Sequence, residues 1–398
     1  MRLLFVTQDF PPDVGGIQTY SWEVAHRLAA RAEHLTVMAP DRPDAAPVDA
    51  TASVRVLRLP GRPDLFPLTL LPALPARARQ TQADIAVHAQ WQTVGASVLA
   101  RALFGRPRRI VCAAHGRELL FNPAAACPGL GAAYDHLRRT LLRQVDVFLP
   151  VSHYTAGLLH EQGIPPRHTH VVPNGTDPDR FRPRDGTDLR RRLGLSDRPL
   201  LLTVGRLVRR KGIDTVLRAL PTLAQACPDV AYVIAGTGPD RARLERLAAR
   251  RGVRGRVQFV GDIGHDRLPL YYSAADLFVM PAREDPPSVE GFGLVFLEAN
   301  ACGTPVIGAR TGGIPDAIRE GETGLLVPPN APDALAAAAT HVLASPEVAE
   351  RLGRQGRHRA VHDASWDAIA DRIYDLLTCE SAQPAASPAR FAEDAPGR

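Results

Sequence analysis

The sequence predicts an α/β protein built from two successive units, each with a parallel sheet covered by helices on both faces. Three observations support this fold class. A chain of 398 residues exceeds the size at which one hydrophobic core stops growing. Short, nearly continuous apolar runs alternate with longer segments of helical pattern, as in parallel sheets joined by crossover helices. Both halves of the chain also open in the same order, with a strand, a glycine loop and a helix.

Twelve short apolar runs are predicted as strands, six in each half of the chain. In the first half they span residues 2–7, 34–40, 53–59, 83–89, 109–115 and 145–151. In the second half they span residues 200–205, 230–236, 256–261, 276–281, 304–309 and 324–329. Because the intervals between them suit crossover helices, each set is expected to form its own parallel sheet.

The strand pattern pauses between the two sets, where the residues NGTDPDRFRPRDGTD are rich in Pro, Gly and Asp. We therefore expect a linker over 174–198 between a first unit at 1–173 and a second unit at 199–365. A helix is expected over 364–378. The last residues, 381–398, have too little apolar content to pack and are expected to form a disordered tail.

Composition excludes several classes of protein. With 45% hydrophobic and 23% charged residues, the chain is expected to be globular rather than disordered. Its five cysteines are odd in number and never form a CxxC pair, which argues against a disulfide framework or a zinc cluster and favours a reducing cytosol. The apolar run at residues 1–7 is interrupted by Gln8 and Asp9, too early for a signal peptide or a membrane span. A net charge of +6 permits anionic partners such as nucleotide phosphates, anionic lipids or nucleic acid.

The stretch GRLVRRKGID contains Lys211, the only lysine among the 48 basic residues of the chain. It lies between a predicted strand and a helix expected to start near Ile213, so Arg206 and Lys211 fall at the carboxyl end of a parallel strand. Open α/β sheets bind their ligands at that edge. A compact ammonium group suits a phosphate oxygen. Arg209 and Arg210 are interpreted as solvated residues of a basic turn.

The second motif is VEGFGLVFLEANACGTPVIG, in which Glu290 and Glu298 flank a helix predicted to begin near Phe292. The backbone N–H groups of Gly293 and Leu294 would then point outward from the positive end of the helix, a suitable site for a diphosphate. Glu298, about two turns into the helix, suits the cis hydroxyls of a ribose. Glu290 suits hydroxyls of the group beyond the phosphates. The alternative is two surface glutamates at a helix start.

Two features of the first half suggest the other side of a site. Gly16 and its neighbour Gly15 follow the first strand, so a ligand can approach the backbone closely there, unless the two glycines form a plain turn. His115 ends a predicted strand in the sequence VCAAHGRE. A histidine at a strand end is often structural, but the flanking Gly116 and Glu118 favour a functional role.

Taken together, these motifs resemble those of the retaining glycosyltransferases of family 4, which have the GT-B fold. The resemblance extends over most of the chain. It also includes PPDVGG (11–16), VSHYTAGLL (151–159), VVPNGTDPDRF (171–181), AGTGP (235–239), FVGDI (259–263) and TGGIPDAIREGETGLLVPP (311–329), in the family's order. It implies two Rossmann-like domains facing each other across a cleft, with residues 366–380 returning to pack on the first.

The resemblance implies transfer of a sugar from a nucleotide-sugar with retained anomeric configuration, without a metal or another cofactor. The implied catalytic residues are His115, Arg206, Lys211 and Glu290. The implied donor-binding residues are Gly16, Arg206, Lys211, Asp262, Ile263, Glu290, Phe292, Gly293, Leu294 and Glu298. The segment AREDPPSVEGFG further resembles bacterial mannosyltransferases that act on phosphatidylinositol lipids, so the expected donor is GDP-mannose or a UDP-sugar.

The expected partners are a nucleotide-sugar and a glycan or lipid-linked acceptor, with no nucleic acid. The expected location is the cytoplasm, with contact at the inner face of the membrane. The helix YDHLRRTLLRQVDVFL offers such a contact through Arg138, Arg139 and Arg143, but a solvated arginine face over a buried leucine stripe is the preferred interpretation.

Other functions remain as alternatives. A sugar-nucleotide epimerase or hydrolase, or a catalytically inactive nucleotide-sugar-binding protein, would use the same donor pocket. A phosphorylase with pyridoxal phosphate would need Lys211 as its Schiff base. An NAD-dependent oxidoreductase rests only on AGTGP, which lacks the third glycine of the dinucleotide fingerprint.

Overall fold

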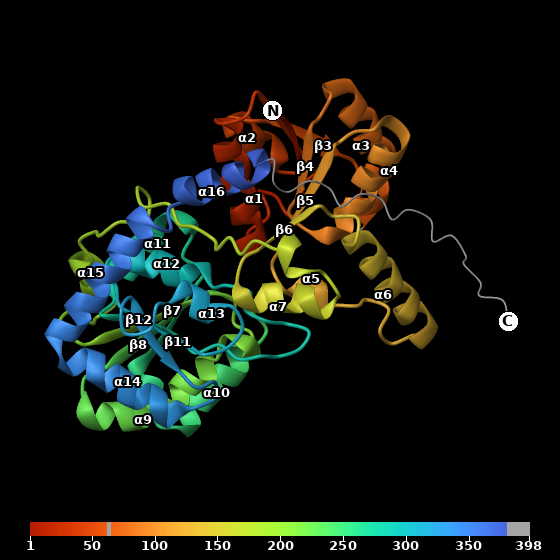
Figure 1. Cartoon of the computed structure of the whole chain (residues 1–398). Coiled ribbons are helices and arrows are strands. Elements are labelled where there is room, and N and C mark those ends of the chain that lie inside the picture. The colour runs from red at the N-terminus through yellow and green to blue at the C-terminus, as the bar shows by residue number, and fades with distance from the viewer. Residues whose placement is uncertain (62–64, 380–398) are drawn as a thin grey trace.

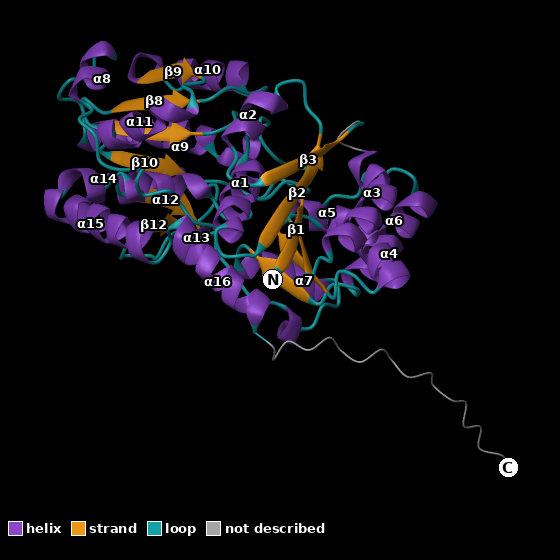
Figure 2. Ribbon diagram, turned by 90° about the horizontal axis from the view of Figure 1, so that it is seen from above, coloured by secondary structure: helices purple, strands orange, loops and turns teal. Residues whose placement is uncertain are grey.

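Two parallel six-stranded sheets form the framework of the computed structural model, which describes residues 1–61 and 65–379 (Figure 1). The tail expected at 381–398 lies outside the described residues. Figure 2 shows the two sheets side by side, each with helices around it. All twelve predicted strands are present, most of them one or two residues shorter than predicted. The predicted α/β class is therefore confirmed.

The first sheet has the order β3-β2-β1-β4-β5-β6. Its strands are β1 Arg2–Val6, β2 His34–Pro40, β3 Arg55–Leu59, β4 Ile85–His88, β5 Arg109–Ala114 and β6 Val147–Pro150. Its helices are α1 Gly16–Ala29, α2 Ala45–Thr51, α3 Phe66–Thr81, α4 Val94–Phe104, α5 Arg117–Leu120, α6 Pro128–Leu142 and α7 His153–Glu161. Alternate residues of β1 face opposite sides: Leu3 and Phe5 pack with α1, whereas Leu4 and Val6 pack with α3 and α4.

The second sheet has the order β12-β11-β10-β7-β8-β9, so both sheets share one doubly wound topology. Its strands are β7 Leu200–Val204, β8 Ala231–Ala235, β9 Val257–Gly261, β10 Leu277–Met280, β11 Val306–Ala309 and β12 Gly324–Val327. Its helices are α8 Thr187–Arg192, α9 Ile213–Ala226, α10 Arg241–Arg250, α11 Leu268–Ala274, α12 Leu294–Ala301, α13 Ile314–Ala317, α14 Pro332–Ala344 and α15 Pro346–His362. In this topology the strand order reverses between β1 and β4 and between β7 and β10, where such sheets bind ligands.

One predicted boundary is wrong in a way that bears on the site. Helix α12 begins at Leu294 rather than near Phe292, because Gly293 has a φ of +98° and so lies in the left-handed region that ends or precedes a right-handed helix. Glu298 is consequently the fifth residue of the helix, little more than one turn in, rather than two turns in.

The chain crosses between the two units twice, and the crossings lie side by side. The backbone N–H of Thr176 donates to the carbonyl of Ala364 (2.8 Å), and that of Trp366 donates to the carbonyl of Thr176 (2.9 Å). A side chain at Gly175 would come within 3.0 Å of the backbone of Trp366, so only glycine fits there. Phe181, which follows the first crossing, is already buried in the core of the second sheet, well before the end of the predicted linker.

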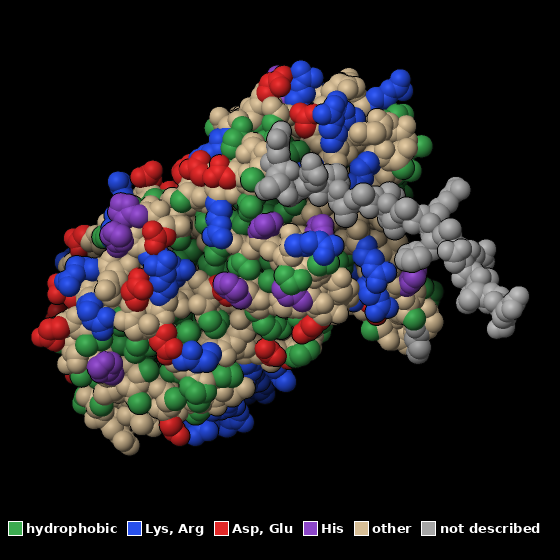
Figure 3. Space-filling view, in the orientation of Figure 1, with side chains coloured by type: hydrophobic (Ala, Val, Ile, Leu, Met, Phe, Trp, Pro, Cys, Tyr) green, Lys and Arg blue, Asp and Glu red, His purple; other side chains and the backbone are tan. Residues whose placement is uncertain are grey.

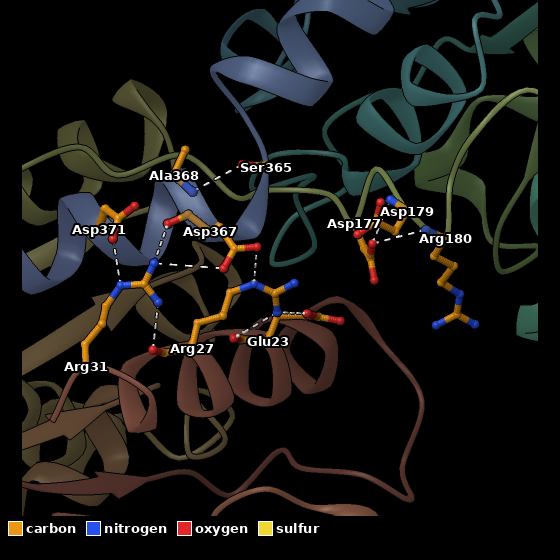
Figure 4. Close-up of polar contacts among 10 residues, drawn as sticks. All are labelled: Glu23, Arg27, Arg31, Asp177, Asp179, Arg180, Ser365, Asp367, Ala368 and Asp371. Carbon is orange, nitrogen blue, oxygen red and sulfur yellow. Dashed lines mark hydrogen bonds and ion pairs between the residues drawn. The ribbon is translucent and has the colours of Figure 1, made fainter. Parts of the chain in front are cut away.

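After the second crossing, helix α16 (Trp366–Thr378) packs against α1 and buries apolar side chains in the core of the first unit. Charged residues frame this contact (Figure 4). Arg31 pairs with Asp371 (2.6 Å), and Arg27 with Asp367 (3.3 Å). The C-terminal helix therefore fastens the end of the second unit to the first helix of the chain.

Candidate active site

The loop after β7 brings the lone lysine to the sheet edge. Gly212 has a φ of +70°, and a side chain there would overlap the carbonyl oxygen of Pro281, so this turn requires glycine. The AGTGP loop after β8 supports the same turn, since the N–H of Leu207 donates to the carbonyl of Thr237 (2.8 Å). In this structure the AGTGP segment is a brace for the loop that carries Arg206 and Lys211.

Lys211 and Glu290 meet where β7 and β10 end. The Lys211 Nζ atom donates to Oε2 of Glu290 over 2.7 Å, and Arg210 pairs with the same oxygen. Burial lowers the pKa of Lys211, and Glu290 opposes that effect. Burial would raise the pKa of Glu290, but Lys211 and Arg210 together lower it to about 2. Glu290 is therefore a carboxylate at neutral pH, and two cations share its charge.

Arg206 differs from these two cations. Its side chain is exposed, and it makes no hydrogen bond or ion pair with any residue that the structure describes. Because it lies on the same loop as Lys211, it is available to a ligand that reaches the edge of β7.

Two helix N-termini converge on the same region. A Cβ atom at Gly16, the first residue of α1, would lie 3.7 Å from the Leu294 Cδ1 atom at the start of α12. The first N–H groups of a helix have no acceptor within it, and its N-terminus carries partial positive charge. The side chain of the preceding Phe292 is buried in the core, so only its backbone is available to a ligand.

Glu298 lies in a small pocket between the two units. Tyr272 donates its hydroxyl to the Glu298 carboxylate (2.7 Å), and burial raises the pKa of Glu298. The pocket is lined by residues of α1, of both crossings and of the second unit: Thr19, Glu23, Gly175, Thr176, Asp177, Arg180, Phe181, His265, Leu294, Glu298 and Trp366. Glu298 is thus close to both chain crossings.

His115 comes from the first unit and meets the loop that carries Glu290. A side chain at Gly291 would overlap the His115 carbonyl oxygen, so the two loops are in direct contact. Glu118 fixes this turn by accepting hydrogen bonds from the N–H groups of His115 (2.5 Å) and Gly116 (3.2 Å). The imidazole packs edge-on against Tyr20, and burial lowers its pKa to about 4. Its buried Nε2 atom has no hydrogen-bond partner among the described residues.

The remaining predicted residues lie further along the second sheet. Asp262 and Ile263 follow β9, two strands away from β7. Asp262 is exposed, whereas Ile263 is buried in the core. No contact joins either side chain to Lys211 or Glu290 among the described residues.

Two interpretations of arginines were wrong. Arg210 is not a solvated turn residue, because it pairs with Glu290. Nothing in the sequence distinguishes it from Arg209, its neighbour in the same 3₁₀ turn. In α6, Arg138 is buried and pairs with Asp135 (2.8 Å), whereas Leu137 is 52% exposed. The leucine stripe is therefore not the covered face of that helix throughout.

The described residues contain no group of three or more His, Cys, Asp or Glu side chains placed to hold a metal ion. Within the same residues, no helix is both long and apolar enough to cross a membrane.

Comparisons with known proteins identify the family of the chain. A family model described as Glycosyltransferase Family 4 matches residues 14–180, and one described as Glycosyl transferases group 1 matches residues 185–359. The GDP-mannose-dependent alpha-(1-6)-phosphatidylinositol monomannoside mannosyltransferase of Mycolicibacterium smegmatis is 35% identical over 393 residues, covering 94% of this chain and 98% of the relative. The GDP-mannose-dependent monoacylated alpha-(1-6)-phosphatidylinositol monomannoside mannosyltransferase of Corynebacterium glutamicum is 30% identical over 391 residues. The match covers 95% of this chain and 98% of the relative.

Among solved structures, Anabaena HepE in complex with UDP superposes with a TM-score of 0.79 at 21% identity, covering 95% of this chain and all of that one. This similarity concerns the fold.

Proposed function

The chain belongs to the family 4 glycosyltransferases, with their GT-B fold, and on that premise we propose that it transfers mannose from GDP-mannose to a phosphatidylinositol mannoside at a membrane surface. The donor and the acceptor are those that the names of the mycobacterial and corynebacterial relatives state. Similarity to those relatives covers both units, so it includes the donor side and the acceptor side.

The observation that carries the proposal is the position of Lys211 and Glu290 against the His115 loop. A nucleoside diphosphate gains negative charge as its bond to the sugar breaks. Lys211, the free Arg206 and the N-termini of α1 and α12 supply fixed positive charge at this place. Groups that bind the departing diphosphate more strongly than the intact donor accelerate the reaction. In this proposal, these groups supply the charge that a metal supplies in other enzymes.

Glu290 suits a role in holding the sugar better than a role as nucleophile. A double displacement needs a carboxylate that attacks the anomeric carbon. Glu290 is bound by two cations that lower its pKa to about 2, so its oxygens are weakly basic. We assign it to hydroxyls of the donor sugar. Retention then follows from departure and attack on the same face of the sugar, steered by the leaving phosphate.

His115 suits the same reaction as a neutral group. With a pKa of about 4 its imidazole is uncharged at neutral pH. Its unpartnered Nε2 atom is available for a hydrogen bond with a sugar or acceptor hydroxyl.

The first unit carries a surface that suits a lipid-linked acceptor. Of eleven large apolar side chains that are exposed in the described residues, ten lie on or next to α3, α4, α5 and α6: Leu65, Leu68, Leu71, Leu99, Leu103, Phe104, Leu120, Phe121, Leu130 and Leu137. Residues 65–143 also carry ten arginines and three carboxylates, a net charge of +7. Basic and apolar side chains lie together over α6 (Figure 3). This combination favours an anionic lipid surface.

The test is a transfer assay with labelled GDP-mannose and vesicles of phosphatidylinositol mannoside, with excess EDTA present. We expect a labelled glycolipid. UDP-sugars replace the donor in parallel reactions, and free inositol phosphate replaces the acceptor. Release of free mannose without glycolipid would favour the hydrolase alternative, and glycolipid formed only from a UDP-sugar would refute the proposed donor. Loss of transfer on chelation, restored by magnesium, would refute the metal-free mechanism.

A further inference from the structure

Glu290, Lys211 and Arg210 form an ion cluster beside the proposed sugar site. Arg210 is the one member of this cluster to which the motifs assign no role. The Oε2 atom of Glu290 accepts hydrogen bonds from both Lys211 Nζ and Arg210 Nη1. The three side chains are 13%, 9% and 23% exposed, so water screens their charges only partly. The cluster therefore holds two positive charges and one negative charge in a largely buried place.

The backbone fixes Arg210 in this position. Its carbonyl accepts a hydrogen bond from the N–H of Arg283 (2.8 Å), on the loop after β10. The Arg283 side chain in turn pairs with Asp214, at the start of α9, and donates to Thr215 (3.2 Å). Asp214 is 2% exposed. The turn with Arg210 and the loop with Glu290 are thus tied together at a point outside the sugar site.

A bound donor changes the surroundings of Glu290. When Lys211 turns its charge toward the diphosphate, Glu290 shares that lysine with a strong anion. Burial and a nearby like charge both favour the protonated carboxylic acid, which donates a hydrogen bond where the carboxylate would accept one. A second cation that stays paired with Glu290, and does not bind the diphosphate, would keep the carboxylate from being protonated.

We propose that Arg210 is a positioning residue that keeps Glu290 ionised and correctly oriented toward the donor sugar while Lys211 serves the diphosphate. The inference rests on the proposed function in one respect, namely the role of Glu290 as the residue that binds the sugar. Arg210 acts through Glu290 and touches neither the diphosphate nor the sugar.

Arg209 provides a matched control. It precedes Arg210 in the same 3₁₀ turn, Arg209–Lys211, and its side chain is exposed. Arg209→Ala removes the same charge from the same turn. It leaves the Glu290 cluster intact, so we expect wild-type binding and turnover.

The first experiment compares the affinity for the sugar nucleotide with that for the free nucleoside diphosphate by calorimetry. Arg210→Ala should weaken binding of GDP-mannose about 10-fold or more and binding of GDP by less than about 3-fold. The reason is that only GDP-mannose carries the sugar that Glu290 binds. Arg210→Lys should restore most of the difference. Equal weakening of both ligands would overturn the proposal, since Arg210 would then bind phosphate or merely hold the turn. No weakening of either would also overturn it.

Coupling and pH provide the second experiment. In a Glu290→Ala background, Arg210→Ala should weaken GDP-mannose binding little further, because both substitutions disrupt the same contact between Glu290 and the sugar. In the single Arg210→Ala variant, the acid limb of the kcat profile should move up by about one pH unit or more, and Arg210→Lys should reverse the shift. Independent, additive losses at all pH values would contradict a role through Glu290.

The donor is identified first, from the sugar nucleotide that raises the melting temperature of the wild-type protein, and the Arg210 variants are measured with that compound. If it is not GDP-mannose, the proposed function fails while the Arg210 proposal is still tested. If no sugar nucleotide binds, both fail.

Discussion

Rarity and surroundings, more than residue type, single out the candidate site residues of this protein. Lys211 stands out because arginine fills every other basic position, and Glu290 stands out because glycines surround it. Both lie where parallel strands end, which a strand pattern predicts. Arg210 could not be recognised in this way, because its contact depends on which way two neighbouring arginines point in a tight turn. The residue that orients the Arg210 side chain is Glu290, on a loop 80 residues further along the chain.

The first prediction at this scale concerns Lys211. Lys211→Ala should lower kcat/KM about 100-fold or more, as expected for the loss of one strong electrostatic contact with a developing charge. Lys211→Arg should recover little, because the site is buried and the guanidinium group is larger and planar. Steady-state kinetics of both variants beside Arg209→Ala tests this. Unchanged kinetics in Lys211→Ala would show that the lysine does not serve the leaving group.

The second prediction concerns two buried histidines. Burial lowers the pKa of His88 to about 3 and that of His115 to about 4, below the ordinary 6.5. The unfolded chain therefore binds protons that the folded chain excludes, and the free energy of unfolding should fall as the pH drops from about 6.5 toward 4. Each histidine adds up to about 1.4 kcal/mol per pH unit.

Urea unfolding at several pH values measures this slope. His88 lies between the hydroxyls of Thr93 (2.7 Å) and Ser97 (2.8 Å), so His88→Gln keeps polar contacts and should reduce the slope by nearly one proton. His34, which is exposed, serves as the control, and His34→Gln should leave the slope unchanged. Equal slopes in all three proteins would contradict the assignment of His88 as a buried neutral group.

At the scale of elements, periodicity predicts a helix and its two faces but not which face the fold covers. In α6, Arg138 lies against the ring of Tyr134 while Leu137 is exposed, so the preferred interpretation fails at these two residues, although Leu142 is buried and Arg139 is exposed as predicted. The predicted start of α12 is also wrong, since periodicity does not show that Gly293 adopts a left-handed conformation, in which a Cβ atom would come within 2.7 Å of the Phe296 ring. The twelve strands were predictable because strands covered on both faces have continuous apolar sequences.

The third prediction concerns the exposed apolar face of α4 and α6. Replacing Leu103 and Leu137 by Asp should weaken binding to vesicles that contain anionic lipid, because each change removes apolar area and adds repulsion. Turnover of a water-soluble acceptor analogue should stay near the wild-type rate. Sedimentation with vesicles is the measurement. The variant with both Arg246→Gln and Arg250→Gln on α10 lowers the net charge by the same two units and is the control for charge alone. Equal loss there would remove the case for a specific face.

At the scale of the whole molecule, the candidate site draws its residues from both units. His115 comes from the first and Lys211, Glu290 and Glu298 from the second, as their positions in the sequence indicate. Loops of the two units touch across the opening: a Cβ atom at Gly116 would lie 3.2 Å from the Val289 side chain, one at Gly291 would overlap the His115 carbonyl oxygen, and the N–H of His153 donates to Asp316 (3.2 Å). Ligand sites between two units joined in this way commonly close by a hinge motion, and we expect the same here.

The fourth prediction follows from this arrangement. Saturating GDP should lower the radius of gyration in solution scattering, because the diphosphate draws the N-termini of α1 and α12 together. Asp316→Ala should enlarge the radius of the free protein and leave that of the complex nearly unchanged. A radius that nucleotide does not alter would show that the units are fixed relative to each other.

The paired crossings at Thr176 and Trp366 also lead us to expect an order in which ligands leave. Two chain segments joined by backbone hydrogen bonds along one line can act as a hinge about that line, and in such a rotation the atoms nearest the axis move least. The pocket of Glu298 includes Gly175, Thr176 and Trp366 themselves, so it lies almost on the axis. The contact between His115 and Gly291 belongs to loops that no crossing residue holds together. We therefore expect rotation about this line to separate His115 from Gly291 much further than it widens the pocket of Glu298, so a ligand bound in that pocket would be the last to leave.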